Sequence, residues 1–92
     1  MWIRSQDKEL LKNVNSIEII EFDGEKYTTI QGDGWHLGVY STKEKALKVL
    51  DEIQNAIEDT GFYRIDNIGH GTYAFSKGVL VYQMPQDDEV GL

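Results

Sequence analysis

Two histidines, His36 and His70, are the residues best suited to acid–base or metal chemistry near neutral pH. They lie far apart, and neither belongs to a spaced set of histidine, cysteine, aspartate or glutamate of the zinc-binding kind. His36 alternates with apolar neighbours, so we expect it to point away from the core. His70 lies between two glycines, a pattern typical of a loop tip, where a histidine would act as a ligand contact. The sequence therefore predicts no metal site.

The chain also lacks the patterns of nucleophilic and phosphate-binding sites. It has no cysteine and no Gly-x-Ser-x-Gly motif. The glycines at 32 and 34 precede an expected strand, so they do not open a helix toward a phosphate. Adjacent carboxylates such as Asp51-Glu52 belong to a solvated helix face, whereas acid–base pairs need differing, partly buried environments. We therefore expect a protein that is not an enzyme and has no cofactor.

Aromatic and arginine side chains are the remaining candidates for contact with a partner. Most of the aromatic residues are expected in the core, but a sheet with one helix leaves its second face uncovered. Aromatic residues on that face would bind a partner chain, a second copy or a flat ligand. Arginines and tyrosines could instead bind phosphate and stack on a base. The candidate contact residues are Arg4, Trp35, His36, Tyr63, Arg64 and His70.

A helix over about residues 42–60 is the clearest predicted element. Ser41 and Glu44 form the expected capping box, and Gly61 supplies the C-terminal stop. Apolar residues between them recur with the helical period of 3.6 and define one buried face. Alternating, β-branched and aromatic residues before this helix predict strands at 16–22, 26–31 and 35–40. These strands form a meander that leads directly into the helix.

The ends of the chain complete the predicted fold. Residues 1–4 could form an edge strand, and residues 72–75 and 79–84 predict a C-terminal hairpin. The fold class is α+β: an antiparallel sheet with the helix packed on one face, followed by this hairpin. We expect a single domain over residues 1–85 and an acidic, frayed tail over residues 86–92.

The composition and net charge of the chain indicate which classes of partner to expect. The 92 residues carry 16 acidic and 9 basic side chains and a net charge of −7, which opposes direct binding to nucleic acid. The N-terminal residues show no apolar signal-peptide region, and no stretch approaches the ~18 apolar residues of a membrane span. We therefore expect a cytoplasmic protein without a membrane or nucleic-acid partner.

Three strings of the sequence resemble a known group of proteins. They are the opening Ile3-Arg4-Ser5-Gln6-Asp7-Lys8, the run from Leu37-Gly38-Val39-Tyr40 into Ala46–Ile53, and the closing Tyr82-Gln83-Met84-Pro85. Together they resemble small proteins of Gram-positive bacteria and their phages, whereas residues 54–78 do not. The group carries no established activity, so the resemblance assigns no functional residue. It implies a phage or mobile-element origin.

Two functional hypotheses follow. The first is a small non-enzymatic accessory protein that binds a host protein, which could be a component of a defence system. The second is a binder or sponge for a nucleotide signal that acts as a homo-oligomer. A chain this short buries little ligand alone, so its pocket would form between two copies.

Overall fold

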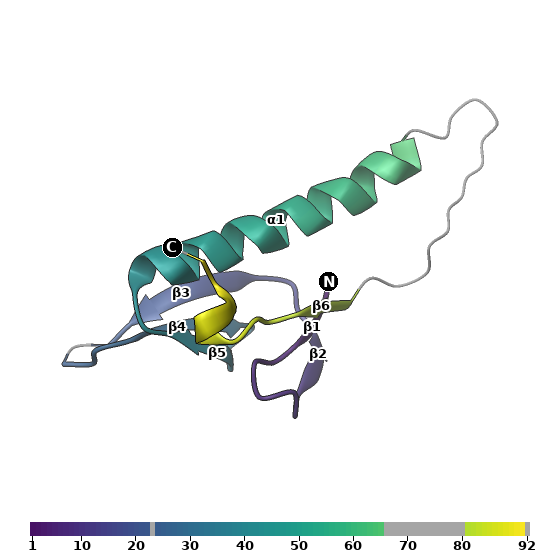
Figure 1. Ribbon diagram of the computed structural model, residues 1–92. Helices are drawn as coiled ribbons and strands as arrows, with labels where there is room; N and C mark the ends of the chain where they lie inside the picture. Colours follow the sequence, from purple (N-terminus) through teal and green to yellow (C-terminus); the bar gives the residue numbers. More distant parts are fainter. Residues whose placement is uncertain (23, 66–80, 92) are drawn as a thin grey trace.

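The computed structural model describes residues 1–22, 24–65 and 81–91 (Figure 1). The described elements are one helix and six strands, with a short 3₁₀ turn near the C-terminus. In chain order they are β1 (Trp2–Arg4), β2 (Leu11–Asn13), β3 (Ile17–Glu21), β4 (Thr28–Gly32), β5 (Trp35–Tyr40), α1 (Lys43–Ile65), β6 (Val81–Gln83) and the 3₁₀ turn Asp87–Glu89.

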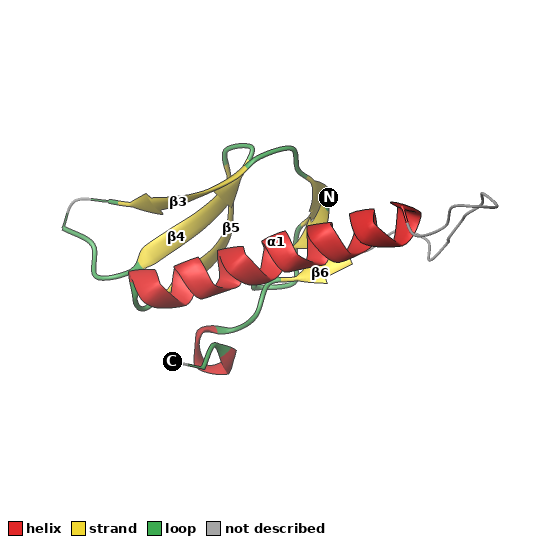
Figure 2. Cartoon of the chain, turned by 90° about the horizontal axis from the view of Figure 1, so that it is seen from above, coloured by secondary structure: helices red, strands yellow, loops and turns green. Residues whose placement is uncertain are grey.

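The strands β3, β4 and β5 form the predicted antiparallel meander, in that spatial order. The helix α1 crosses one face of this sheet and continues over β6, as Figure 2 shows from above. The α+β prediction, with one main helix on a meander, is therefore confirmed. The helix extends to Ile65, beyond the predicted stop at Gly61.

A tight turn and a β-bulge set the geometry of β5. Asp33 and Gly34 have φ values of 50° and 86°, the left-handed conformations of a two-residue hairpin turn. The register then shifts, because Gln31 pairs with His36 whereas Ile30 pairs with Gly38. The residue at position 37 is therefore the extra residue of a bulge, which reverses the alternation of β5. The simple alternation predicted for residues 35–40 is wrong for this reason.

The helix begins one residue later than the sequence suggested. The Thr42 hydroxyl accepts a hydrogen bond from the Lys45 backbone N–H at 3.1 Å, and the Thr42 carbonyl accepts from Ala46 at 3.2 Å. Thr42 is therefore the N-cap, and the prediction that Ser41 caps the helix is wrong. The Ser41 backbone N–H instead donates to the Asp87 carboxylate at 2.8 Å.

A second sheet has the spatial order β2-β1-β6. β1 pairs antiparallel with β2 and parallel with β6, so residues 2–4 form a central strand and not the edge strand that the sequence suggested. Parallel strands need a long crossover connection, and the meander and α1 both lie between β1 and β6 in the sequence. The first strand of the predicted C-terminal hairpin, residues 72–75, lies outside the described residues.

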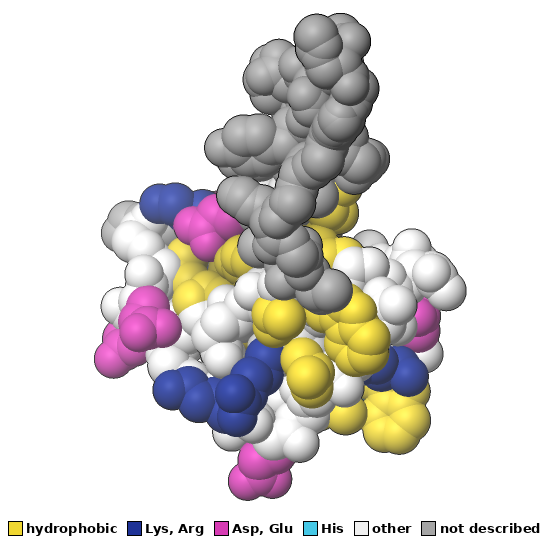
Figure 3. Space-filling model, turned by 90° about the vertical axis from the view of Figure 1, so that its right-hand side faces the viewer, with side chains coloured by type: hydrophobic (Ala, Val, Ile, Leu, Met, Phe, Trp, Pro, Cys, Tyr) yellow, Lys and Arg dark blue, Asp and Glu magenta, His cyan; other side chains and the backbone are white. Residues whose placement is uncertain are grey.

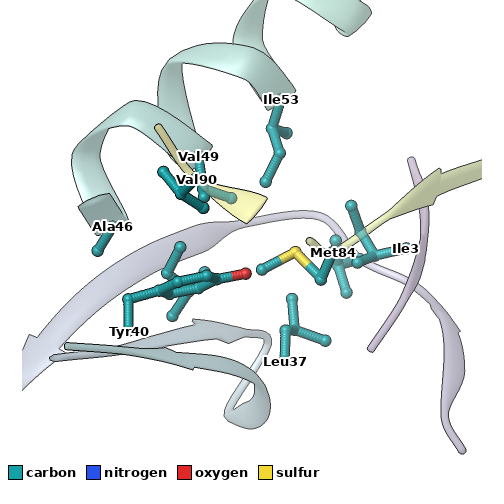
Figure 4. Packing of buried hydrophobic residues seen from close by; sticks show 10 residues of the cluster. Ile3, Leu37, Tyr40, Ala46, Val49, Ile53, Met84 and Val90 are labelled. Atoms are coloured by element: carbon teal, nitrogen blue, oxygen red, sulfur yellow. The ribbon is translucent and has the colours of Figure 1, made fainter. Parts of the chain in front are cut away.

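The core lies between α1 and the two sheets, where the elements meet (Figure 4). The Tyr40 ring lies at its centre with the Met84 side chain beside the phenol oxygen. The buried apolar residues come from β1, β4, β5, α1 and the segments that follow β2, β6 and the 3₁₀ turn: Ile3, Val14, Ile30, Leu37, Tyr40, Ala46, Val49, Ile53, Met84 and Val90. The described residues therefore share one continuous core.

The acidic C-terminal residues pack against the helix, in contrast to the predicted frayed tail. Val90 is only 6% exposed and joins the core. Asp87 accepts hydrogen bonds from the Ser41 N–H and from Lys45 Nζ, and the Lys45 ammonium also bonds the Asp87 carbonyl. The Lys48 ammonium bonds the Gly91 carbonyl. These contacts fix the tail to the first turns of α1.

Candidate functional site

The opening polar string forms a closed turn between β1 and β2. The Ser5 hydroxyl, which is almost fully buried, donates to Asp7 Oδ1 at 2.6 Å and accepts from the Leu10 N–H at 3.1 Å. Asp7 also accepts from the Glu9 N–H at 3.0 Å. The Ser5 hydroxyl, followed by the Glu9 N–H, lowers the pKa of Asp7 below its ordinary value. These hydrogen bonds hold the turn closed.

Gln6 joins this turn to the edge of β5. Its amide Nε2 donates to the Val39 carbonyl at 3.0 Å, and its Oε1 accepts from the Val39 N–H at 2.9 Å. Nε2 also donates to the Pro85 carbonyl at 3.2 Å. The side-chain amide thus occupies the hydrogen-bonding position that a neighbouring strand would take, so the edge of β5 is satisfied at this point.

The other two strings of the resemblance meet at the same joint. The Tyr40 hydroxyl donates to the Pro85 carbonyl at 2.8 Å. A Cβ atom on Gly38 would lie 3.0 Å from the Tyr40 hydroxyl and 3.3 Å from Met84, so the absence of a side chain at Gly38 permits this close packing. The three strings therefore build the joint between β1, β5, β6 and α1. Their contacts at this joint are packing contacts between these elements.

The uncovered face of the meander carries an apolar patch. Ile20, Thr29 and Val39 lie in one row across β3, β4 and β5, on the face opposite the helix. Thr29 is 2% exposed, whereas Val39 is 37% and Phe22 is 44% exposed. The rings of Phe22 and His36 approach to 6.3 Å between centroids at a 48° tilt. We call Ile20, Phe22, His36 and Val39 the outer-face patch.

The bulge explains why His36 and Val39 share this face. Residues 36 and 39 would point to opposite faces of a regular strand, because they are an odd number of positions apart. The extra residue at position 37 brings both to the outer face. The sequence correctly predicted that His36 points away from the core, but it did not predict Phe22 and Val39 as its neighbours.

Trp35 lies apart from this patch. It pairs with Gly32 at the end of β5 and is 54% exposed. The Lys12 ammonium lies 5.1 Å from its ring centroid, a cation–π contact between the two sheets. Trp35 therefore packs against β2 and does not form one site with His36.

Arg4 lies on the outward face of the other sheet. Its Nε donates to the Lys8 carbonyl at 3.1 Å. The ladders place it on the same face as three exposed apolar residues, Trp2, Leu11 and Val81. Figure 3 looks onto this end of the molecule and shows hydrophobic side chains beside lysine and arginine side chains. The structure thus separates Arg4 from His36 and Trp35.

The remaining predicted contact residues, or their side chains, lie outside the described part of the chain. Tyr63 and Arg64 belong to the last turn of α1, and their side chains lie outside the described part of the chain. His70 lies outside the described residues altogether. No site can therefore be assigned to these three positions.

The sequence did not predict an apolar groove between α1 and the β3 side of the meander. Its volume is about 690 Å³, within the ~300–1,000 Å³ of typical ligand pockets. We call it the α1–β3 groove. Its lining is Met1, Val14, Asn15, Ile17, Leu50, Ile53, Gln54, Ile57 and Glu58. Leu47 and Ile57 are 43% and 49% exposed, so the apolar stripe of α1 is wider than the core that it covers. The width of this apolar stripe is the feature of the sequence that could have indicated the groove.

Other kinds of site are not evident in the described part of the chain. Among these residues, no three histidine, cysteine or carboxylate side chains gather as metal ligands would. Every buried side-chain nitrogen and oxygen described has a hydrogen-bond partner. No described helix is both long and apolar enough to cross a membrane.

Comparisons with protein-family models, curated proteins and solved structures find no match to this chain. The fold and surfaces define a small α+β domain with a helix-covered meander and two apolar surface features, the outer-face patch and the α1–β3 groove.

Proposed function

We propose that this chain is a non-enzymatic accessory protein that binds a partner protein through the outer-face patch. The observation that carries the proposal is the exposure of Phe22 and Val39, at 44% and 37%, on the face of the meander opposite α1. Contiguous apolar side chains on one face of a small domain are typical of interfaces between proteins. Aromatic residues at the centre of such a patch contribute most of the binding energy.

Charge favours a protein over nucleic acid as the partner. The net charge of −7 repels a phosphate backbone, and a nucleic-acid site depends on lysine and arginine contacts to phosphate. The outer-face patch contains no lysine or arginine. The resemblance of the three strings to small phage proteins makes a bacterial host protein the first partner to test.

Capture of a partner from a Gram-positive bacterial lysate tests the proposal when patch variants are compared. The tagged full chain, the double variant Phe22→Ser with Val39→Ser, and the control Leu11→Ser are used as baits. Leu11 is 55% exposed on the other sheet, so Leu11→Ser removes similar apolar area elsewhere. Circular dichroism melts establish first that all three chains fold.

We expect the wild type and Leu11→Ser to retain one stoichiometric host protein and the double variant to lose it. Equal retention by all three baits would contradict the proposal. Bound species are also released by heat and identified by mass spectrometry. A stoichiometric nucleotide in place of a protein would support the alternative, a nucleotide-signal binder.

A further inference from the structure

The strand β3 is the edge strand of the meander and forms one wall of the α1–β3 groove. The spatial order β3-β4-β5 leaves one side of β3 without a paired strand among the described residues. Ile17 of β3 lines the groove, and Leu50, Ile53 and Ile57 of α1 line its opposite wall. A strand edge, an apolar groove and a helix therefore lie next to one another.

An edge strand of this kind is a template for another strand. Alternate residues of an edge strand direct their backbone N–H and C=O groups away from the sheet, where an extended peptide can pair with them. Main-chain pairing then supplies affinity, and pockets for alternate side chains supply specificity. We infer that an extended segment of the partner protein pairs with β3 as a fourth strand and inserts alternate side chains into the α1–β3 groove. This inference rests on the proposed function, the binding of a partner protein.

The register of β3 specifies the apolar positions of such a segment. Ile17 and Ile19 point to the helix side of the sheet, since they pair with Gly32 and the buried Ile30. Ile20 points to the opposite face, where it belongs to the outer-face patch. Residues of the added strand opposite Ile17 and Ile19 would enter the groove, and the residue opposite Ile20 would extend the patch. All three positions favour apolar residues.

Charge specifies the remaining positions. Glu18 and Glu21 of β3 are exposed, and Glu58 lines the groove on α1. The cation nearest to Glu21 is Lys43, whose ammonium lies 3.5 Å from its carboxylate. Within the described part of the chain, neither Glu18 nor Glu58 has a lysine or arginine within salt-bridge distance. Lysine or arginine opposite Glu18 and Glu21 therefore complements this edge.

The amino group of Met1 also lies at the groove, but it is already bound. It donates to Asn13 Oδ1 at 3.0 Å and to the Val14 carbonyl at 3.1 Å. The groove lining itself thus carries Glu58 and this ammonium, whereas Glu18 and Glu21 lie along the β3 strand, Glu18 on the outer face and Glu21 beside Lys43. The net charge of −7 for the whole chain adds a long-range attraction for a basic segment.

The same charges disfavour a second copy of the chain on this edge. An antiparallel pair of β3 strands centred on Ile19 places the two Glu18 side chains diagonally, at about 7–8 Å between backbone positions. It also brings together two chains that each carry −7. A different protein with basic residues is the occupant that these charges favour.

A synthetic peptide tests the inference directly. The sequence Thr-Lys-Val-Ile-Lys-Val-Thr places lysines opposite Glu21 and Glu18 and apolar residues opposite Ile17, Ile19 and Ile20 in antiparallel pairing. Its binding to the full chain is measured by fluorescence anisotropy. The control peptide has the same composition with its two lysines adjacent. We expect saturable binding of the first peptide and at least about tenfold weaker binding of the second.

Two variants measure separately how the apolar groove and the charge of β3 contribute to peptide binding. Ile57→Ser removes an exposed apolar side chain from the groove, and Leu11→Ser is its control on the other sheet. Glu18→Lys reverses a charge beside the added strand, and Glu9→Lys makes the same change of net charge in the β1–β2 turn. We expect Ile57→Ser and Glu18→Lys to weaken peptide binding about tenfold, and both controls to remain within about twofold of wild type.

A charge-swapped peptide provides a result that misfolding would not produce. Replacing both lysines with glutamate should abolish binding to the wild type and partly restore it to Glu18→Lys. Equal effects of Glu18→Lys and Glu9→Lys, or no peptide binding at all, overturn the inference. A captured host protein that depends on Phe22 and Val39 but not on Ile57 or Glu18 overturns the inference alone and leaves the proposed function standing. A chain that sediments as a dimer even after dilution, and no longer does so as Glu18→Lys, also overturns the inference. That result would favour a second copy of the chain as the occupant of the β3 edge.

Discussion

At the scale of single residues, Gln6 shows how one side chain can replace a strand. Its amide makes two hydrogen bonds to the Val39 backbone and a third to the Pro85 carbonyl. We predict that Gln6→Ala lowers the free energy of unfolding by about 1–2 kcal/mol, because it removes all three hydrogen bonds of this amide to the backbone, two of them exposed and one partly buried. Gln6→Glu should be at least as damaging at neutral pH, since it places a carboxylate against two carbonyl oxygens.

Urea denaturation monitored by circular dichroism measures this effect. The control is Gln54→Ala, because Gln54 is exposed and donates one hydrogen bond, to Glu58 at 3.0 Å. We expect the control to change the free energy of unfolding by less than about 0.5 kcal/mol. Equal effects of Gln6→Ala and Gln54→Ala would show that the edge of β5 does not depend on this amide.

Asp33 links the β4–β5 turn to acid stability. The backbone N–H groups of Asn15 and Ser16 donate to its carboxylate at 3.0 Å and lower its pKa below the ordinary value of 3.8. The folded state therefore binds fewer protons at this group than the unfolded state. Its contribution to stability is present above pH 3.8 and is lost as the pH falls through the lowered pKa.

We predict that Asp33→Asn lowers the melting temperature at neutral pH and reduces its fall on acidification. Asparagine tolerates the left-handed φ of 50° at this position, so the turn itself is preserved. Thermal melts of both chains between neutral pH and about pH 3 measure the difference. Asp7 and Asp87, whose pKa values are also lowered, retain the rest of the acid dependence. Parallel pH curves for the two chains would exclude the assigned role.

Residue types alone predict part of the structure at the scale of single residues. The sequence correctly indicated that His36 points away from the core. It could not show that Val39 shares the face of His36, because that depends on a bulge at the buried Leu37, which the local pattern does not reveal. It also could not show that Gln6 reaches a strand more than thirty positions away.

At the scale of elements, a tyrosine hydroxyl fixes the joint between β5 and the segment after β6. The Tyr40 hydroxyl donates to the Pro85 carbonyl at 2.8 Å, and burial raises the pKa of Tyr40 above its ordinary value. We predict that Tyr40→Phe costs about 1–1.5 kcal/mol in urea denaturation, the net value of a buried hydrogen bond. Tyr82→Phe is the control and should cost less, because its bond to Glu52 is exposed. The reverse order would contradict this assignment.

The C-terminal segment is a second element-scale test. Val90 is 6% exposed in the core, although the acidic residues before it suggested a frayed tail. We predict that Val90→Ala lowers the free energy of unfolding by about 1.5 kcal/mol, the value of about two buried methyl groups. Val81→Ala, at a side chain that is 47% exposed, should change it by less than about 0.5 kcal/mol. An unchanged free energy of unfolding in Val90→Ala would instead support the predicted frayed tail.

The contrast between the two sheets shows which elements a sequence can predict. The meander and α1 follow from local periodicity and turn residues, and the prediction is confirmed. The strands β1, β2 and β6 contain three residues each, too few to show a period. Their pairing depends on contacts between the two ends of the chain, such as the Met84 N–H to the Arg4 carbonyl. Local patterns carry no information on such contacts.

At the scale of the whole molecule, the two candidate surfaces lie on opposite faces of one strand. Ile17 lines the α1–β3 groove, Ile19 points to the same face of the sheet, and Ile20 belongs to the outer-face patch. A segment added along β3 would therefore contact both surfaces with alternate side chains. The helix protects only one face of the meander, so its other face and its edge are available together. One partner segment can then explain why both remain apolar.

Salt separates the contribution of charge from that of apolar contact in such a complex. The Debye length falls from ~30 Å at 0.01 M to ~3 Å at 1 M salt, so attraction between the lysine peptide and the acidic chain is screened. We predict that the peptide dissociation constant rises at least about tenfold across this range in wild type. The slope should be small in Glu18→Lys and intermediate in Glu9→Lys, which changes the net charge of −7 equally but leaves Glu18 in place. Identical slopes in the two variants would mean that the peptide responds only to total charge, and that β3 does not position its lysines.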